Sequence, residues 1–198
     1  MAQHGQRFSS LNVTVLGDDL YCHQPLCQQL LDQQLDFILV CRPDSHPTLY
    51  EHLEGIELPT LTTQRWAGKV EETYTYRYLN GVPLRDSDDA LLVNWCEITV
   101  SRHESKVTYK NSFATSHILT DETVAEIVLA GRTRWKVENE NNNTLKTKGY
   151  NLEHNFGHGK QHLSSFLATL NILSLLFHTF RTYARVICTD GCLSCSIR

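Results

Sequence analysis

The apolar and polar positions near the start of the chain follow the order strand, helix, strand. Leu11–Gly17 is a short apolar run that ends at Asp18, which predicts a buried strand. Residues 21–35 carry leucines at helical spacing, and residues 36–41 form a second apolar run stopped by an Arg-Pro pair. Strand, helix and strand at this spacing predict a βαβ unit whose strands are parallel.

The pattern changes to a β type over residues 61–118. Residues 72–79 alternate strictly, and the Asn80-Gly81 pair after them predicts a tight hairpin turn. Two further strands are expected at residues 91–100 and 106–113. We interpret this region as an antiparallel β insertion between two parts of an α/β core.

Helical spacing returns after residue 120. We expect one long helix that begins near Thr120, is capped by a Thr123–Glu126 capping box, and ends at Lys148 before Gly149. The stretch rich in Gly, His and Asn that follows predicts a loop.

A second helix is expected at residues 164–183, with apolar side chains nearly all round. Its longest apolar run, Phe166–Phe177, is too short to span a bilayer and contains Asn171, so we expect a buried helix and no membrane association. The first ten residues are polar and resemble no signal peptide, which favours a cytoplasmic protein.

Glu138 is the acidic residue whose position is most suggestive of chemistry. A step of 100° per residue places it on an apolar helical face. The other members of that face are Val124, Ile127, Val128, Gly131, Trp135 and Leu145. A carboxylate directed into a core is costly unless a cation or metal compensates it, although an ordinary ion pair with Arg134 is the structural alternative.

The composition is that of a soluble globular protein, with 41% hydrophobic and 20% charged residues among 198. Seven irregularly spaced cysteines are typical of free thiols in a reducing compartment. The net charge of −4 argues mildly against a dedicated nucleic-acid binder. However, residues 131–162 hold six Lys or Arg against three Asp or Glu, which fits either phosphate binding or a solvated helix face.

Two segments together resemble the DDE transposases of bacterial insertion sequences. Val13–Tyr21 looks like the family's strand with its second catalytic aspartate, which makes Asp18 the match and Tyr21 its companion. The Arg134–Glu138 step resembles the Arg-x-x-x-Glu of the catalytic helix, and Lys146 resembles the basic residue two turns further on. The β insertion before that helix also matches a subgroup of the family.

The resemblance implies a partial ribonuclease-H-like α/β fold with an antiparallel β insertion and a C-terminal helical part. The parts would be a partial core at 11–60, the insertion at 61–118, a catalytic-type helix and a C-terminal helix at 119–180, and an irregular tail at 181–198.

The chemistry that the resemblance implies is metal-dependent DNA cleavage and strand transfer with Mg²⁺ or Mn²⁺. Asp18 and Glu138 would be catalytic metal ligands, while Arg134, Lys146 and Tyr21 would contact the DNA of the transposon ends. The family's first aspartate lies on an earlier strand that these 198 residues do not include. We therefore expect an inactive fragment, which would pair with itself or with a full-length transposase.

Other interpretations remain open at this stage. The chain could be a non-catalytic inhibitor, or a metal-binding module that uses His154, His158 and His162 or the cysteines at 188, 192 and 195. Asp18 or Asp19 could simply be a turn residue or a helix cap after a strand. The tyrosines at 74, 76 and 78 could stack on bases or form the packed face of a sheet.

Overall fold

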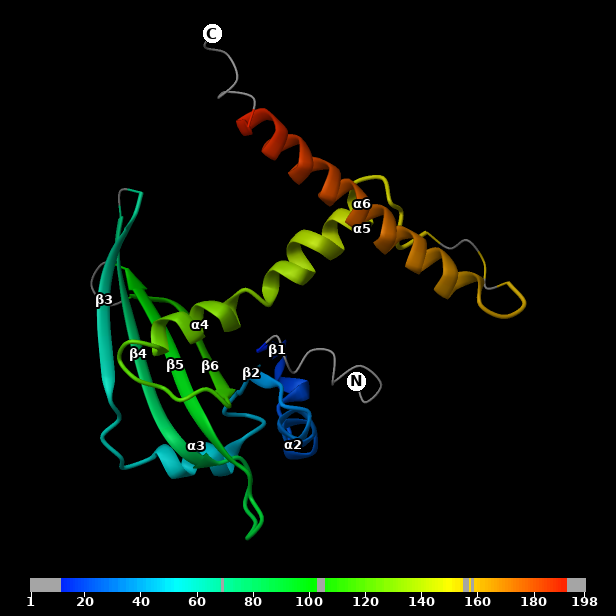
Figure 1. Cartoon of the computed structure of the whole chain (residues 1–198). Helices are drawn as coiled ribbons and strands as arrows, with labels where there is room; N and C mark the ends of the chain where they lie inside the picture. Colours follow the sequence, from blue (N-terminus) through cyan, green and yellow to red (C-terminus); the bar gives the residue numbers. More distant parts are fainter. Residues whose placement is uncertain (1–11, 69, 103–105, 155–156, 158, 192–198) are drawn as a thin grey trace. The chain divides into compact units, whose positions relative to one another are not determined.

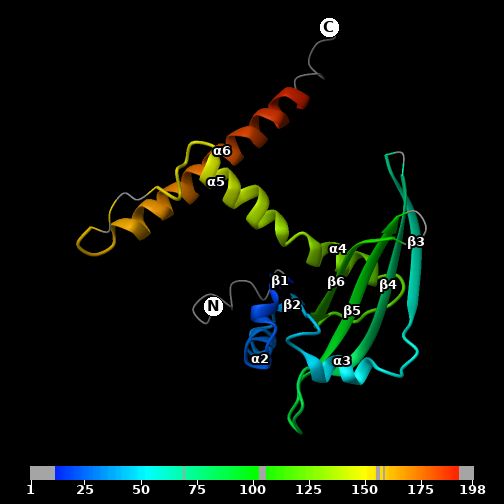
Figure 2. The ribbon, with the colours of Figure 1, turned by 180° about the vertical axis from the view of Figure 1, so that it is seen from behind.

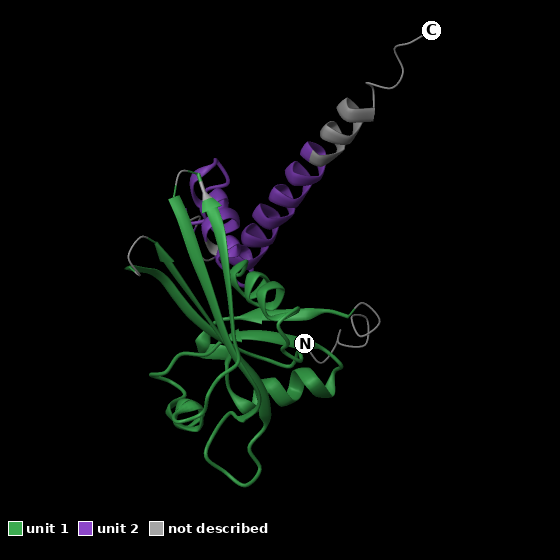
Figure 3. Cartoon of the chain, turned by 90° about the vertical axis from the view of Figure 1, so that its left-hand side faces the viewer, with its two compact units in different colours: residues 1–134 green, residues 135–198 purple. Residues whose placement is uncertain are grey.

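The computed structural model describes residues 12–68, 70–102, 106–154, 157 and 159–191. Within these ranges, the side chains of Ala67, Glu138 and residues 183–191 are not described. The chain forms two compact units, residues 1–134 and 135–198 (Figure 3). Each unit is treated by itself below.

The first unit is built on one six-stranded mixed sheet with the order β1-β2-β6-β5-β4-β3 (Figure 1). The strands are β1 (Thr14–Gly17), β2 (Asp36–Val40), β3 (Thr60–Ala67), β4 (Val70–Pro83), β5 (Leu92–Arg102) and β6 (Lys106–Thr115). β1 and β2 are parallel, and all other neighbours are antiparallel. The predicted mixed α/β class and the parallel βαβ unit are confirmed.

The region that we predicted as an antiparallel insertion continues the same sheet. Its last strand, β6, pairs with β2 on one side and with β5 on the other. A short 3₁₀ turn, η2 (Asp19–Tyr21), and helix α2 (Gln24–Asp32) connect β1 to β2, and α3 (Pro47–Leu53) follows β2 (Figure 2).

Each face of the sheet has its own apolar cluster. α2 and α3 contribute Leu30 and Leu49 to a cluster around Trp95, whereas α4 (Val124–Arg132) packs on the opposite face against Ile98 and Phe113. The tyrosine stripe belongs to this second face: Tyr76 and Tyr78 are buried and Tyr74 is half-buried. The packed-face interpretation of the stripe therefore holds, and base stacking by buried rings is excluded.

The predicted hairpin turn at Asn80-Gly81 is wrong, because both residues lie inside β4. The pairing shifts between Leu79 and Val82, which marks a β-bulge, and Gly81 there has φ of +74°. The Asn80 side chain is held by the Leu119 backbone, accepting from its N–H and donating to its carbonyl oxygen. A local turn signal is thus overridden by a tertiary contact.

The predicted long helix is interrupted after α4. Thr133 and Arg134 form a turn, and a π-helical segment at Val137–Asn142 precedes α5 (Asn143–Thr147). The capping box is also wrong, since the Thr123 hydroxyl accepts from the Thr120 N–H and donates to the Ile118 carbonyl.

The single apolar face through Glu138 is therefore not maintained. Val124, Val128 and Gly131 are buried, but Trp135 is 47% exposed. The turn and the i→i+5 spacing of a π-helix change the register that a constant step of 100° assumes.

The second unit contains the π-helical segment, α5 and the long helix α6 (Leu163–Gly191). The predicted second helix is confirmed, and it extends into residues 181–191, which we expected to be irregular. The prediction that it is buried is wrong: its large apolar side chains, from Phe166 to Phe180, are mostly exposed. By length and composition alone, Leu163–Thr182 could cross a membrane.

Candidate functional site

Two loops meet where the parallel strands β1 and β2 end. The first carries Asp18, Asp19 and Cys22, and the second carries Cys41 and His46. The carboxyl ends of parallel strands lie at one edge of a sheet, where ligands of open α/β folds commonly bind. The pairing of Gly17 with Leu39 brings these loops together.

Asp18 has two partners in the structure. Its Oδ1 accepts a hydrogen bond of 2.9 Å from the Asp19 N–H, which caps the 3₁₀ turn. Its Oδ2 lies 3.7 Å from Nη1 of Arg134, and the Asp18 side chain is 53% exposed. The Asp18–Arg134 ion pair thus joins the two segments on which the family resemblance rests.

The other predicted site residues are distributed over both units. Tyr21 ends the 3₁₀ turn and is exposed. Glu138 lies in the π-helical segment of the second unit, and its side chain lies outside the described residues. Lys146, in α5 of the same unit, forms an ion pair of 2.8 Å with Glu153. Of the predicted residues, the structure brings Asp18 and Arg134 into contact.

Asp19 has a structural role that the sequence did not indicate. Its Oδ1 accepts from the Arg42 N–H at 2.8 Å and from the Ser45 hydroxyl at 2.7 Å. Nδ1 of His46 lies 3.6 Å from the same oxygen. This carboxylate therefore holds the loop after β2 against the loop after β1.

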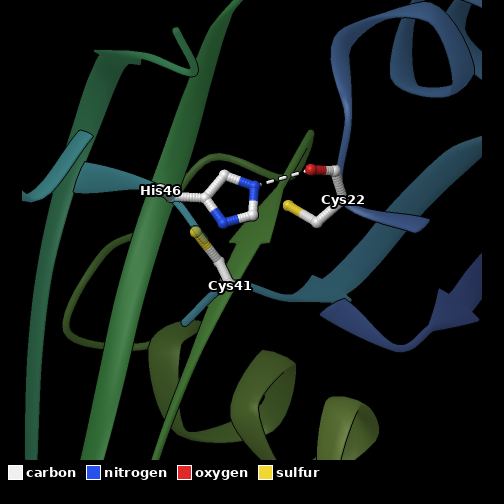
Figure 4. Close-up of side chains that lie close together, drawn as sticks. All are labelled: Cys22, Cys41 and His46. Atoms are coloured by element: carbon white, nitrogen blue, oxygen red, sulfur yellow. Dashed lines mark hydrogen bonds between the residues drawn. The ribbon is translucent and has the colours of Figure 1, made fainter. Parts of the chain in front are cut away.

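A buried cluster of Cys22, Cys41 and His46 (Figure 4) adjoins Asp19, whose Oδ1 contacts His46. One ligand atom from each of the three lies within 4.8 Å of the other two. Nε2 of His46 donates a hydrogen bond of 2.6 Å to the Cys22 carbonyl, which is the dashed line in Figure 4. Two thiols and an imidazole at this distance form a set that could hold a metal ion.

Hydrogen bonds and burial shift the acidities of this cluster. The side-chain hydrogen bond with Cys41, reinforced by burial, raises the pKa of Cys22 far above its usual range. The interaction with the Cys22 side chain raises the pKa of His46 to about 9, against an opposing effect of burial. Both shifts arise from contacts within the cluster, and Asp19 lies beside the imidazole.

This cluster was not predicted, because the irregular spacing of the cysteines is that of unrelated free thiols. Cys27 and Cys96 fit that view, since both are buried with the pKa raised to about 12 by burial. The available signal was positional: Cys22 shortly follows the first predicted parallel strand, and Cys41 is the last residue of the second. The proposed motifs at His158, Cys192 and Cys195 lie outside the described residues.

In comparisons with known proteins, no family model matches this chain and no curated protein matches it.

Proposed function

We propose that this chain is a transposase-type protein of a mobile element, with a partial ribonuclease-H-like core, that binds DNA and a hard divalent cation. Asp18 and Glu138 would be metal ligands for Mg²⁺ or Mn²⁺, since such ions favour carboxylate oxygens. Arg134 and Lys146 would contact DNA phosphates, with Tyr21 beside Asp18. These 198 residues supply two of the family's three carboxylates, so the chain alone would not cleave DNA.

The observation that carries the proposal is the Asp18–Arg134 ion pair at 3.7 Å. The two motif segments are far apart in the sequence, yet this pair brings them to one place at the carboxyl end of β1. Glu138 follows Arg134 by four residues. A half-buried arginine beside an exposed aspartate can exchange this partner for a phosphate once a cation occupies the carboxylate.

The experiment measures binding of a labelled linear duplex and nicking of a supercoiled plasmid, both with Mn²⁺ and with Mg²⁺. We expect salt-dependent binding, which Arg134→Ala weakens several-fold while lowering the salt slope by about 1. Arg85→Ala is the matched control, because Arg85 pairs with Asp89 on another loop and should leave binding unchanged.

The plasmid should remain intact with the 198-residue chain. If the chain nicks the plasmid and Asp18→Asn abolishes the nicking, two carboxylates suffice for cleavage, and the prediction that the chain is inactive is wrong. Binding that is absent, or equally weakened by both arginine variants, would remove the transposase assignment.

A second function, inhibition by pairing with an intact transposase, is favoured by the position of β1. Among the described residues β1 pairs only with β2, so it is an edge strand of the sheet. An apolar groove lined by Leu16, Ile38 and Ile127 lies beside it. A strand from a partner could add to this edge, as in β-strand addition.

Co-expression with an intact relative tests this second function through the transposition frequency. An inhibitor lowers the frequency in proportion to its dose, and Leu16→Lys should relieve the inhibition because a charge blocks edge pairing. Leu92→Lys, at an exposed position of β5, should leave the inhibition unchanged. A frequency independent of dose would exclude this function.

A further inference from the structure

We propose that Cys22, Cys41 and His46 bind a zinc ion, which fastens the loop after β1 to the loop after β2. This site is separate from the carboxylate site of the proposed function and does not depend on it. It would have a structural role, because its ligands lie in the loops that position Asp18 and Asp19.

The ligand types select the metal. Two cysteine sulphurs and an imidazole are soft or borderline donors that suit zinc, whereas Mg²⁺ and Ca²⁺ require oxygen. In a tetrahedral zinc site with Zn–S of about 2.3 Å, neighbouring ligand atoms are separated by roughly 3.8 Å or less. The three ligand atoms already lie within 4.8 Å of one another, so each needs to move by about 1 Å or less.

His46 is already oriented as a zinc ligand requires. Its Nε2–H donates to the Cys22 carbonyl, and Nδ1, which lies 3.1 Å from the Ser45 hydroxyl oxygen, would exchange that contact for the metal. A zinc-bound histidine usually donates its other N–H to a carbonyl or carboxylate, and that contact fixes the tautomer and the ring orientation. Cys22 thus contributes both a sulphur and the carbonyl that orients His46.

Burial makes this a closed site. All three ligand residues are buried, as structural zinc sites generally are, and the carboxylate of Asp19 lies beside His46. Its Oδ1 is 3.6 Å from Nδ1 of His46, and a movement of the Asp19 side chain toward the sulphurs would complete a four-coordinate shell. The Arg42 and Ser45 groups that bind the Asp19 carboxylate would then support it from outside the shell.

The experiment uses the full 198-residue chain, purified under reducing conditions and stripped of metal. The protein is titrated first with Co²⁺ and then with Zn²⁺, and a colorimetric chelator that competes for Zn²⁺ gives the zinc affinity. One equivalent of Co²⁺ should give sulphur-to-cobalt charge-transfer absorption and tetrahedral visible bands, both displaced by Zn²⁺. Cys22→Ser and Cys41→Ser should each lower the zinc affinity at least about 100-fold, since even outer-shell changes cost 10–100-fold.

Two matched controls locate the site. Cys27→Ser alters another buried thiol of the same core and should leave the metal signal intact. A variant with serine at positions 188, 192 and 195 removes the cysteines near the end of the chain and should also retain one equivalent. Circular dichroism of each variant shows whether the fold persists.

Several results would overturn the proposal. One is the absence of charge-transfer absorption in the folded wild-type chain, which would leave His46 as an ion-pair partner of Asp19. Another is loss of the signal in the variant at 188, 192 and 195, which would place the metal there. A third is a Cys22–Cys41 disulphide in protein purified without reductant, detected by thiol counting and peptide mapping, which would assign the pair to redox chemistry.

Discussion

The apolar side chains of the two compact units differ in burial. In the first unit, each face of the sheet is covered by helices of the same unit, so that Trp95 is only 1% exposed and Ile98 is equally buried. In the second unit, α6 is as apolar as a core helix, yet Phe180 is 70% exposed. Periodicity therefore predicts that an element forms, but a partner within the same unit decides whether its apolar side chains are buried.

The largest expected effect concerns the buried core of the first unit. Trp95→Ala removes a fully buried ring from β5 and should lower the free energy of unfolding by about 3–5 kcal/mol. Urea unfolding followed by circular dichroism measures it. Leu92→Ala, on the same strand but 64% exposed, is the control and should change the value by less than about 0.5 kcal/mol. Equal effects would show that the core of the first unit is not the stabilising element.

A smaller effect tests how closely α4 packs on the sheet. A Cβ added at Gly131 would lie 2.8 Å from Phe113 and 2.9 Å from Ile38. Gly131→Ala should therefore destabilise the unit by about 1 kcal/mol, because overpacking of about 1–3 kcal/mol exceeds the helical preference for alanine. Leu129→Ala, on the exposed side of α4, is the comparison. A net stabilisation by Gly131→Ala would show that α4 moves freely on the sheet.

The third effect depends on pH. Hydrogen bonds from Tyr74 and Arg102 hold the pKa of Glu72 below its ordinary value of 4.5. A lowered folded-state pKa gives stability that is present above pH 4.5 and is lost as the pH falls through the folded value.

Glu72→Gln should therefore reduce stability at neutral pH and flatten its loss on acidification, as measured by thermal unfolding from pH 7 downward. The exposed neighbour Glu71, changed to Gln, should keep the wild-type profile. Identical acid profiles for wild type and Glu72→Gln would contradict the prediction.

The smallest expected effect concerns the exposed apolar side chains of α6. Phe180→Ala should change the free energy of unfolding by less than about 0.5 kcal/mol, because its ring is already exposed. The same variant should lower binding of a dye that reports exposed apolar surface. A loss comparable to that of Trp95→Ala would mean that α6 is covered in solution.

The local signals of the sequence predicted much of the first unit. The apolar runs before Asp18 and before Arg42 gave β1 and β2, and their parallel pairing follows from the helix between them. The strict alternation in residues 72–79 gave the central part of β4. In each case the side-chain period of a single element carries the information.

Features that depend on distant residues were not predicted. Asn80-Gly81 is a good turn sequence, but the Leu119 backbone binds Asn80 and keeps the pair within a strand. Likewise, the Thr133 hydroxyl donates to the Ala130 carbonyl where α4 ends, and nothing in the apolar spacing marks that end.

The residues of the candidate site also differ in whether a local sequence pattern indicates them. Asp18 was proposed because a motif surrounds it in the sequence, and the structure places its carboxylate 3.7 Å from Arg134. Cys22, Cys41 and His46 form no local motif, since only the pairing of β1 with β2 makes them neighbours. The sequence pattern therefore indicates a site when one segment carries it, and misses a site that the sheet assembles.

The bulge in β4 also determines which face of the sheet the side chains after it point toward. Tyr76 and Tyr78 face α4, whereas Val82 and Leu84 belong to the Trp95 cluster on the other side. All four have even numbers, so only the additional residue at the bulge reverses the orientation. A one-codon deletion at Gly81 would therefore turn Val82 from the face of the Trp95 cluster to the face that α4 covers, while the same deletion between Arg85 and Ala90 would merely shorten a loop.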